Sequence, residues 1–352
     1  MSEPDASESI LQPEELKPAV ELIARAIDQL DRVLLGRSDL HRTVMVAILS
    51  RGHVLFEGLP GVGKTALVKA LGQILDLEFN RVQFTPDLMP GDILGTHILE
   101  DGADGRRGMT FHPGPVFTNL LLADEINRAS PKTQSALLEA MQEQAVTLLG
   151  TTRALPNPFF VLASQNPIEL EGTYPLPEAQ LDRFLFKLVV DNVEVDVLDR
   201  IITTRRRGET PTPSWKMNAG ELNRIFEVMD RIYLPAPVSR YISRLVGATH
   251  ANGAEATEQV RRYVSYGASP RAAIAIAEAA RGRALIHGRP TVGFEDVKAV
   301  VPPVLNHRLV LNYKARLDQV DSFKIISDLL STLDETGLKL PKDVEISGAR
   351  RE

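Results

Sequence analysis

The segment from Gly58 to Thr65 constrains this chain more than any other. Its sequence, GLPGVGKT, has the spacing G-x-x-x-x-G-K-[ST], follows the apolar residues 54–56 and precedes a helical sequence. Glycines let the backbone curl until its N–H groups converge, and the N-terminus of the following helix adds positive charge at the same place. This pattern, between a strand and a helix, predicts a site for the phosphates of a nucleoside triphosphate.

The polar residues of this loop have expected roles. Lys64 is placed to reach the β- and γ-phosphates, and Thr65 to offer its hydroxyl to Mg²⁺. The residues predicted to contact the nucleotide are Gly58, Pro60, Gly61, Val62, Gly63, Lys64, Thr65 and Ala66.

The composition fits a soluble globular protein of two domains. The chain has 352 residues, of which 43% are hydrophobic and 24% charged. A net charge of -6 argues against a chain whose main task is to hold nucleic acid, although a local basic groove remains compatible with it. The sequence has no cysteine and no apolar stretch of membrane-spanning length, and its N-terminus is acidic rather than signal-like. We therefore expect no membrane span and a cytoplasmic location.

Residues 119–125, NLLLADE, form the second decisive element. The apolar run is typical of a strand buried on both faces of a parallel sheet, and ligands bind at the carboxyl ends of such strands. Asp124 suits the shell of Mg²⁺ through a water molecule, and Glu125 suits the base that polarises the attacking water. Paired acids at a strand end are otherwise ordinary solvated residues, but the upstream phosphate loop favours a catalytic role.

A second buried strand is expected over residues 159–163, followed by Ser164, Gln165 and Asn166. The amide of Asn166 lies in line with the predicted site and suits orientation of the attacking water. An asparagine before proline is more often a turn residue. The other elements, in their order, favour the functional interpretation.

Two hairpins are predicted to project from the nucleotide domain. Residues 96–111 contain the turn sequence DGADG at 101–105, between short alternating apolar pieces. Residues 146–155 contain strand-like residues around Gly150. Long insertions in compact domains are usually functional or disordered.

The distribution of polar, strand-like and helical sequence along the chain predicts the domain organisation. We expect an acidic tail over residues 1–15, an α/β nucleotide domain over 16–192 and an all-α domain over 193–352. Residues 34–37, at the end of the first helix, are placed beside the phosphate loop, where apolar backbone can surround an adenine ring. An ordinary helix end explains the same residues equally well.

Arg271 follows Ser269 and Pro270 at the start of a helix. A positive charge in the first turn opposes the helix dipole unless an anion is near. Arg271 is therefore a candidate for facing phosphate, with a solvated surface arginine as the alternative.

Taken together, these motifs resemble the MoxR family of AAA+ ATPases. The resemblance runs from about residue 19 to residue 311 and is carried by the segments 57–65, 121–129, 134–143, 176–184 and 266–271. It implies an α/β fold, with a P-loop AAA+ parallel sheet flanked by helices, followed by an all-α lid domain. It further implies ATP and Mg²⁺ as cofactors and ATP hydrolysis as the activity.

The resemblance also implies roles for individual residues. These are Walker A at 58–65, Walker B at Asp124 and Glu125, sensor 1 at Asn166, an arginine finger at Arg183 and sensor 2 at Arg271. The first hairpin matches the family's insertion in helix 2, and the second its hairpin before sensor 1. Ser164 stands where threonine is expected. Arg128 is the rival of Arg183 for the trans-acting role.

Members of this family are similar in forming homo-oligomeric rings, typically hexamers, that act as chaperone-like ATPases. They commonly work with a partner carrying a von Willebrand factor A domain and help to mature client protein complexes. The resemblance implies this class of task for the chain and does not identify its client.

Two other classes of function are compatible with a phosphate loop. A nucleic-acid motor is the alternative, since insertions in helix 2 also occur in helicase relatives. The net charge and the hairpins, whose basic residues are Arg106, Arg107 and Arg153, argue against it. A nucleotide-gated binding module without turnover is the third hypothesis, and the intact acids at 124 and 125 argue against that.

Overall fold

The structure is a computed structural model that describes residues 10–58, 61, 63–101, 107–167, 172–205 and 210–335. The chain divides into two compact units. One contains the described residues up to Tyr233 together with Glu278–Thr291, and the other contains Leu234–Ala277 and the described residues from Val292 onward. The boundary predicted after residue 192 falls inside the first unit.

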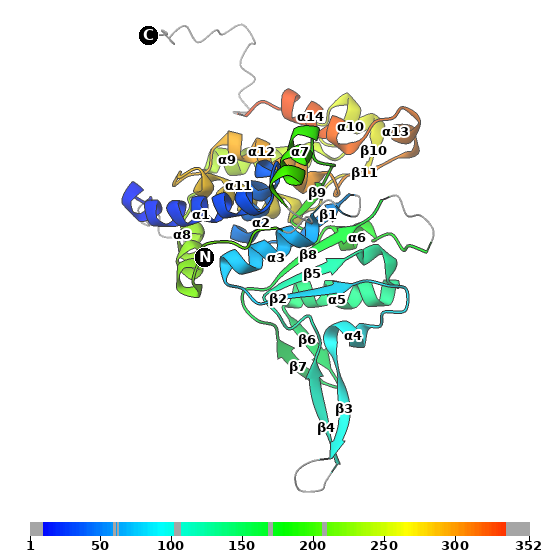
Figure 1. The fold of residues 1–352 in the computed structure, drawn as a ribbon. Coiled ribbons are helices and arrows are strands. Elements are labelled where there is room, and N and C mark those ends of the chain that lie inside the picture. Colours follow the sequence, from blue (N-terminus) through cyan, green and yellow to red (C-terminus); the bar gives the residue numbers. More distant parts are fainter. Residues whose placement is uncertain are drawn as a thin grey trace, which may run out of the picture. The chain divides into compact units, whose positions relative to one another are not determined.

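A five-stranded parallel sheet forms the centre of the first unit (Figure 1). Its order is β2-β5-β8-β1-β9, and its strands are β1 (Val54–Glu57), β2 (Phe79–Gln83), β5 (Leu120–Asp124), β8 (Phe160–Gln165) and β9 (Phe186–Val189). The apolar runs predicted as buried strands form its central part, and all of 120–123 and 160–163 are buried. Continuous apolar runs suit central parallel strands because helices cover both faces of the sheet.

Helices cover the two faces of this sheet. Those of the first unit are α1 (Pro13–Val33), α2 (Ser38–Leu49), α3 (Lys64–Leu75), α4 (Pro90–Leu94), α5 (Pro131–Glu143), α6 (Glu178–Leu181), α7 (Val195–Thr204) and α8 (Ala219–Asp230), with the 3₁₀ helix η1 (Ile126–Arg128). Leu121 and Ala123 share a core with Leu138 of α5. Gly72 of α3 instead faces Leu120, so α3 and α5 lie on opposite faces of the sheet.

The first helix begins earlier than the sequence indicated. α1 starts at Pro13, within the segment expected to be a tail, and residues 1–9 lie outside the described part of the chain. Glu15 accepts a hydrogen bond from the backbone N–H of Gln12 at 2.9 Å, which caps the helix. Leu11 is also buried, so the apolar face continues to that point.

Both predicted hairpins are present. Strands β3 (Gly95–Asp101) and β4 (Arg107–Pro113) form the longer one, which projects from the body of the unit in Figure 1, and β6 (Ala145–Leu148) and β7 (Thr151–Ala154) form the shorter one. Of the turn predicted at 101–105, Asp101 ends β3 and residues 102–105 lie outside the described residues. Arg153 of β7 stacks on Phe111 of β4, with 3.9 Å from its guanidinium carbon to the ring centroid. This cation–π contact joins the two hairpins.

The second unit is mainly helical, as expected. Its elements are α9 (Ala236–Ala248), α10 (Glu258–Tyr263), β10 (Val264–Tyr266), the first residues of α11 (Pro270–Ile286), α12 (Phe294–Leu305), β11 (Val310–Leu311), α13 (Tyr313–Leu317) and α14 (Ser322–Thr332). The short antiparallel pair β10–β11 was not predicted, because two- and three-residue strands leave no periodic signal. No helix in the described ranges is long and apolar enough to cross a membrane.

His53, at the start of β1, is a buried link between sheet and helix. Its Nδ1 accepts a hydrogen bond from the backbone N–H of Val161 at 3.0 Å. Its Nε2 lies 3.3 Å from the carbonyl oxygen of Met141 and must therefore carry the hydrogen. Burial lowers the pKa of His53 from 6.5 to about 4, so the ring is neutral at physiological pH.

Because the imidazole of His53 is buried and neutral, we expect the folded state to lose stability in acid. Because the folded-state pKa lies below the unfolded one, stability contributed by neutral His53 is lost as pH falls from 6.5 toward 4, by at most about 3 kcal/mol. Replacing His53 by glutamine should lower the melting temperature at pH 7.5, and the deficit relative to wild type should shrink at pH 5. His287→Gln, at an exposed position, is the control. An equal deficit at both pH values would contradict this account.

Candidate functional site

The phosphate loop has the backbone that its glycines predicted. Gly63, the residue before α3, has φ 91° and ψ 10°, a left-handed conformation that favours glycine. A Cβ on Gly58 would lie 2.3 Å from the carbonyl oxygen of Val190, so a side chain there requires a backbone shift. The predicted contacts Pro60 and Val62 lie outside the described residues.

Lys64 is the first residue of α3, and its side chain is folded back on the loop. Its Nζ donates a hydrogen bond to the carbonyl oxygen of Gly58 at 2.8 Å. Burial lowers the pKa of Lys64, and the carboxylates of Asp124 and Glu125 oppose that change. The ammonium group is thus held near the place where phosphates are predicted to bind.

Most of the predicted site residues line one cavity. Its volume is about 380 Å³, and its walls are Gly61, Gly63, Lys64, Thr65, Ala66, Arg81, Gln83, Asp124, Glu125, Ser164 and Asn166. These residues come from the phosphate loop, α3 and the carboxyl ends of β2, β5 and β8. Parallel strands end at the same edge of a sheet, which explains the convergence.

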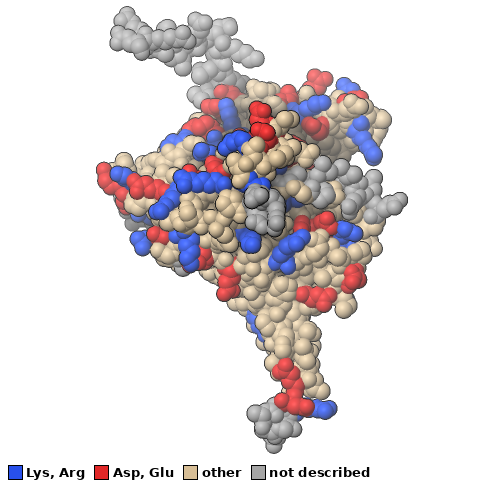
Figure 2. Space-filling view, viewed as in Figure 1, with Lys and Arg blue, Asp and Glu red and all other residues tan. Residues whose placement is uncertain are grey.

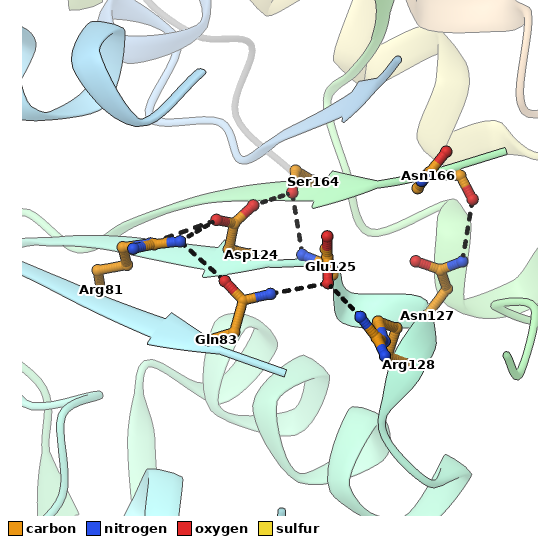
Figure 3. A network of polar contacts seen from close by, with 8 residues as sticks. All are labelled: Arg81, Gln83, Asp124, Glu125, Asn127, Arg128, Ser164 and Asn166. Carbon is orange, nitrogen blue, oxygen red and sulfur yellow. Dashed lines mark hydrogen bonds and ion pairs between the residues drawn. The ribbon is translucent and has the colours of Figure 1, made fainter. Parts of the chain in front are cut away.

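Asp124, the last residue of β5, is held on both carboxylate oxygens. Ser164 donates its hydroxyl to Oδ1 at 2.5 Å. Arg81 donates to Oδ2 through Nη2 at 2.7 Å and through Nε at 3.3 Å (Figure 3). Only 14% of the Asp124 side chain is exposed, so these partners satisfy a nearly buried charge.

Glu125 has a left-handed backbone and is held from two sides. Its φ is 57°, an arrangement that costs about 1–2 kcal/mol for a residue with a side chain. Its backbone N–H donates to Ser164 Oγ at 3.0 Å. Its Oε2 accepts from Gln83 Nε2 at 2.8 Å and from Arg128 Nη1 at 3.1 Å (Figure 3). Such local strain at a polar cavity is typical of functional residues.

Asn166 directly follows β8 and is 7% exposed. Its backbone oxygen accepts a hydrogen bond from Asn127 Nδ2 at 3.3 Å, which ties the end of β8 to the 3₁₀ helix after β5 (Figure 3). The structure thus brings Asn166 to the same cavity as Asp124 and Glu125.

Three cavity residues have roles that the sequence did not reveal. Arg81 and Gln83 alternate on β2, and β2 pairs with β5 so that Gln83 lies opposite Asp124. Ser164 contacts both acids, although its place in the sequence marked it only as a replacement for threonine. The sequence offered one sign of these roles, namely two polar residues at alternating positions near the end of a strand. That sign can be interpreted only when the strand beside β2 is known.

Arg183 has a hydrogen-bond acceptor within its own chain. It lies between α6 and β9, is partly buried, and donates through Nη1 to the backbone carbonyl of Leu138 on α5. A half-buried guanidinium needs acceptors, and a helix carbonyl supplies one. Arg128, its rival, contacts Glu125 of its own chain. The trans-acting role of either residue stays a prediction.

Arg271 is exposed in the first turn of α11 and belongs to the second unit, whereas the cavity belongs to the first. Its role toward phosphate stays a prediction.

A second cavity adjoins the phosphate loop on the side of the first helix. It measures about 600 Å³, and its walls include Leu34, Leu35, Gly61 and Gly63 together with Leu198 of α7. Arg37, Asn192, Arg205 and Thr210 are also among its walls. The structure therefore places Leu34, Leu35 and Arg37 beside the loop, in a mixed apolar and polar setting that suits a planar base.

The cavity residues fit a magnesium nucleotide. A hydroxyl and a carboxylate, from Thr65 and Asp124, are the hard oxygen ligands that Mg²⁺ prefers. Within the described residues, no three acidic or histidine side chains converge to hold an ion by themselves.

Comparisons with known proteins agree with this geometry. The model of the ATPase family associated with various cellular activities (AAA) matches residues 53–186, and that of the AAA lid domain matches residues 256–329. Chaperone MoxR1 of Mycobacterium tuberculosis is 44% identical over 321 residues, which are 91% of this chain and 84% of that protein. Protein MoxR of Methylorubrum extorquens is 32% identical over 333 residues, 89% of this chain and 94% of that protein.

A solved structure is also similar. The crystal structure of a Cytophaga hutchinsonii protein, 38% identical, matches with a TM-score of 0.82 and covers 91% of this chain and 97% of that chain. The fold expected from the sequence, a P-loop parallel sheet flanked by helices and followed by a helical lid, is confirmed. On sequence, fold and motifs together, this chain belongs to the MoxR family of AAA+ ATPases.

Proposed function

We propose that this chain binds ATP with Mg²⁺ and hydrolyses it to ADP and phosphate. The observation that carries the proposal is the convergence of Lys64, Thr65, Asp124, Glu125 and Asn166 on one cavity. That cavity suits the triphosphate, and the adjoining cavity suits the base.

In the proposed reaction Glu125 accepts a proton from a water molecule whose oxygen attacks the γ-phosphorus. The bond from the γ-phosphorus to its bridging oxygen breaks, which releases ADP and phosphate. Lys64 neutralises charge on the phosphates, and the amide of Asn166 orients the water. Thr65 and Asp124 would hold Mg²⁺, which would supply positive charge to the transferring phosphoryl group.

Two variants separate binding from hydrolysis. Glu125→Gln keeps the shape of the side chain but removes the base, so it should bind ATP and hydrolyse it about 10²–10⁴-fold more slowly. Lys64→Ala should weaken ATP binding itself, because it removes charge that contacts the phosphates. Calorimetric binding and steady-state turnover measure these effects, with exposed Glu139→Gln as the control. Near-normal turnover in Glu125→Gln would show that Glu125 is not the base.

We further propose that the active site is completed in a homo-oligomeric ring, with six subunits and with Arg183 supplied in trans. An arginine from a neighbour neutralises charge on the γ-phosphoryl group and is worth on the order of 10³-fold or more in rate. Release of Arg183 from the Leu138 carbonyl is then part of ring assembly.

Subunit mixing tests the shared site. Arg183→Ala and Glu125→Gln should each be nearly inactive alone, whereas mixed rings contain some interfaces with an intact arginine and an intact base. Partial ATPase activity should therefore return on mixing, and wild-type specific activity should rise with protein concentration. Melting temperatures control for folding of each variant. If mixed rings form but recover no activity, Arg128 becomes the better candidate.

The proposed task of the ring is remodelling or activation of client protein complexes. One relative, Chaperone MoxR1, carries a name that supports a chaperone role. A partner with a von Willebrand factor A domain and a cytoplasmic location stay predictions from the family resemblance and the composition.

The hairpins are the proposed contact surface for a client or a neighbouring subunit. Beyond the contact of Arg153 with Phe111, the same face of the β3–β4 ladder continues to Leu99 and Met109, which pair with each other and are 56% and 59% exposed. Leu149, in the β6–β7 turn, is 78% exposed with φ 49°. Exposed apolar side chains on projecting hairpins are typical of interaction sites.

Polar substitution of the hairpin pair tests this surface. Leu99→Ser with Met109→Ser should leave basal ATP turnover and the melting temperature near wild type. It should reduce ATP-dependent protection of a chemically denatured reporter protein from aggregation. Thr96→Ser, on the opposite face of the same ladder, is the control. A large fall in melting temperature would indicate a structural role for the pair instead.

A nucleic-acid motor is the less favoured function. The described part of the β3–β4 hairpin carries Arg107 but also Glu100 and Asp101, and Figure 2 shows most of its visible face uncharged. A strand-binding surface requires a basic groove with aromatic platforms. Salt-dependent binding of single-stranded DNA by assembled rings would reverse this preference.

A further inference from the structure

Arg81 and Asp124 form an ion pair in the wall of the proposed nucleotide cavity. Its Nη2 donates to Asp124 Oδ2 at 2.7 Å and to Gln83 Oε1 at 2.8 Å, using both hydrogens of that nitrogen (Figure 3). Both Arg81 and Asp124 line the cavity, together with Thr65. The guanidinium therefore contacts the carboxylate that the proposed function assigns to magnesium.

The contacts of Asp124 leave no carboxylate oxygen without a donor. Oδ1 accepts from Ser164, whose hydroxyl also accepts from the backbone N–H of Glu125, so this bond is part of the fixed strand edge. Oδ2 accepts hydrogen bonds from Nη2 and Nε of Arg81, and the Arg81 side chain is 47% exposed. Of these two partners, the exposed guanidinium is the one with freedom to leave.

A guanidinium and a hydrated magnesium ion both bind carboxylates through positive charge. Two such cations on the same carboxylate oxygen repel each other, and the repulsion is strong in a partly buried site because screening by water is reduced. The repulsion cannot be relieved by loss of a proton, because the arginine guanidinium stays protonated. Binding of the metal at Asp124 and retention of the Arg81 contact are therefore opposed.

We propose that Arg81 is a positioning residue that holds Asp124 and competes with Mg²⁺ for it. The guanidinium moves off Oδ2 when the magnesium nucleotide binds, so Arg81 raises the Mg²⁺ concentration required for binding. This inference rests on the proposed function, which assigns Asp124 to the metal.

Arg81→Gln gives effects of opposite sign with and without metal. Loss of the competing cation should lower the Mg²⁺ concentration at which half of a fluorescent ATP analogue is bound. The expected decrease is about five-fold, which corresponds to the strength of a partly exposed ion pair. In EDTA the same variant should bind the analogue more weakly, because the cavity has lost positive charge. A purely structural defect would weaken binding in both conditions.

Two further variants act as controls. Arg81→Lys keeps the charge and should retain most of the wild-type Mg²⁺ requirement. Arg107→Gln breaks another arginine–aspartate pair, in which Arg107 lies 2.9 Å from Asp101 on the β3–β4 hairpin. This variant should leave the Mg²⁺ midpoint unchanged. The metal-free melting temperature of Arg81→Gln should fall, because Asp124 loses its counter-charge, and saturating Mg²⁺ with ATP should restore it.

The outcomes separate this inference from the proposed function. If Asp124→Asn shifts the Mg²⁺ midpoint but Arg81→Gln does not lower it, the competition is refuted and the metal site stands. If neither variant shifts the midpoint, the metal site and the competition both fail. If Arg81→Gln weakens binding of Mg²⁺ with ATP more than with ADP, Arg81 contacts the γ-phosphate and the proposal is overturned.

Discussion

The parallel register of β2, β5 and β8 is the constraint on which the site depends. Gln83 lies opposite Asp124, and Ala123 opposite Ala163, so the first polar residues after each apolar run end at one edge of the sheet. The apolar runs are buried on both faces, and a shift of one residue would place each of them on the opposite face. Core packing thereby fixes the positions of the candidate catalytic side chains at the strand ends.

Charge balance explains why the strand edge is so extensively hydrogen-bonded. Two adjacent carboxylates, Asp124 and Glu125, emerge from β5 with little exposure, and burial of unpaired charge is costly. Arg81, Arg128 and Lys64 supply positive charge around them. A nucleotide with its metal brings both signs of charge into this cavity, so its binding must redistribute contacts that already exist. The groups that balance the charge of the two acids are therefore the groups whose contacts a bound magnesium nucleotide would change.

Sequence was sufficient where function is encoded locally. The phosphate loop, the acids after β5 and both hairpins have turn or spacing signals within a few residues, and the structure has the elements predicted for them. The contribution of Arg81 and Gln83 was missed because it depends on which strand lies beside β5. The contact of Arg183 could not be predicted, because its acceptor, the Leu138 carbonyl, lies 45 residues away in sequence. Such contacts follow from tertiary packing, which no local pattern reports.

The most direct test of this account is a high-resolution structure of the Glu125→Gln ring with ATP and Mg²⁺. The account predicts the triphosphate in the cavity lined by Lys64 and Asp124, the base in the cavity beside Leu34, and magnesium close to Thr65. It further predicts that the Arg81 guanidinium has left Asp124 Oδ2. Nucleotide bound elsewhere, or magnesium in place with the Arg81–Asp124 contact of 2.7 Å intact, would contradict it.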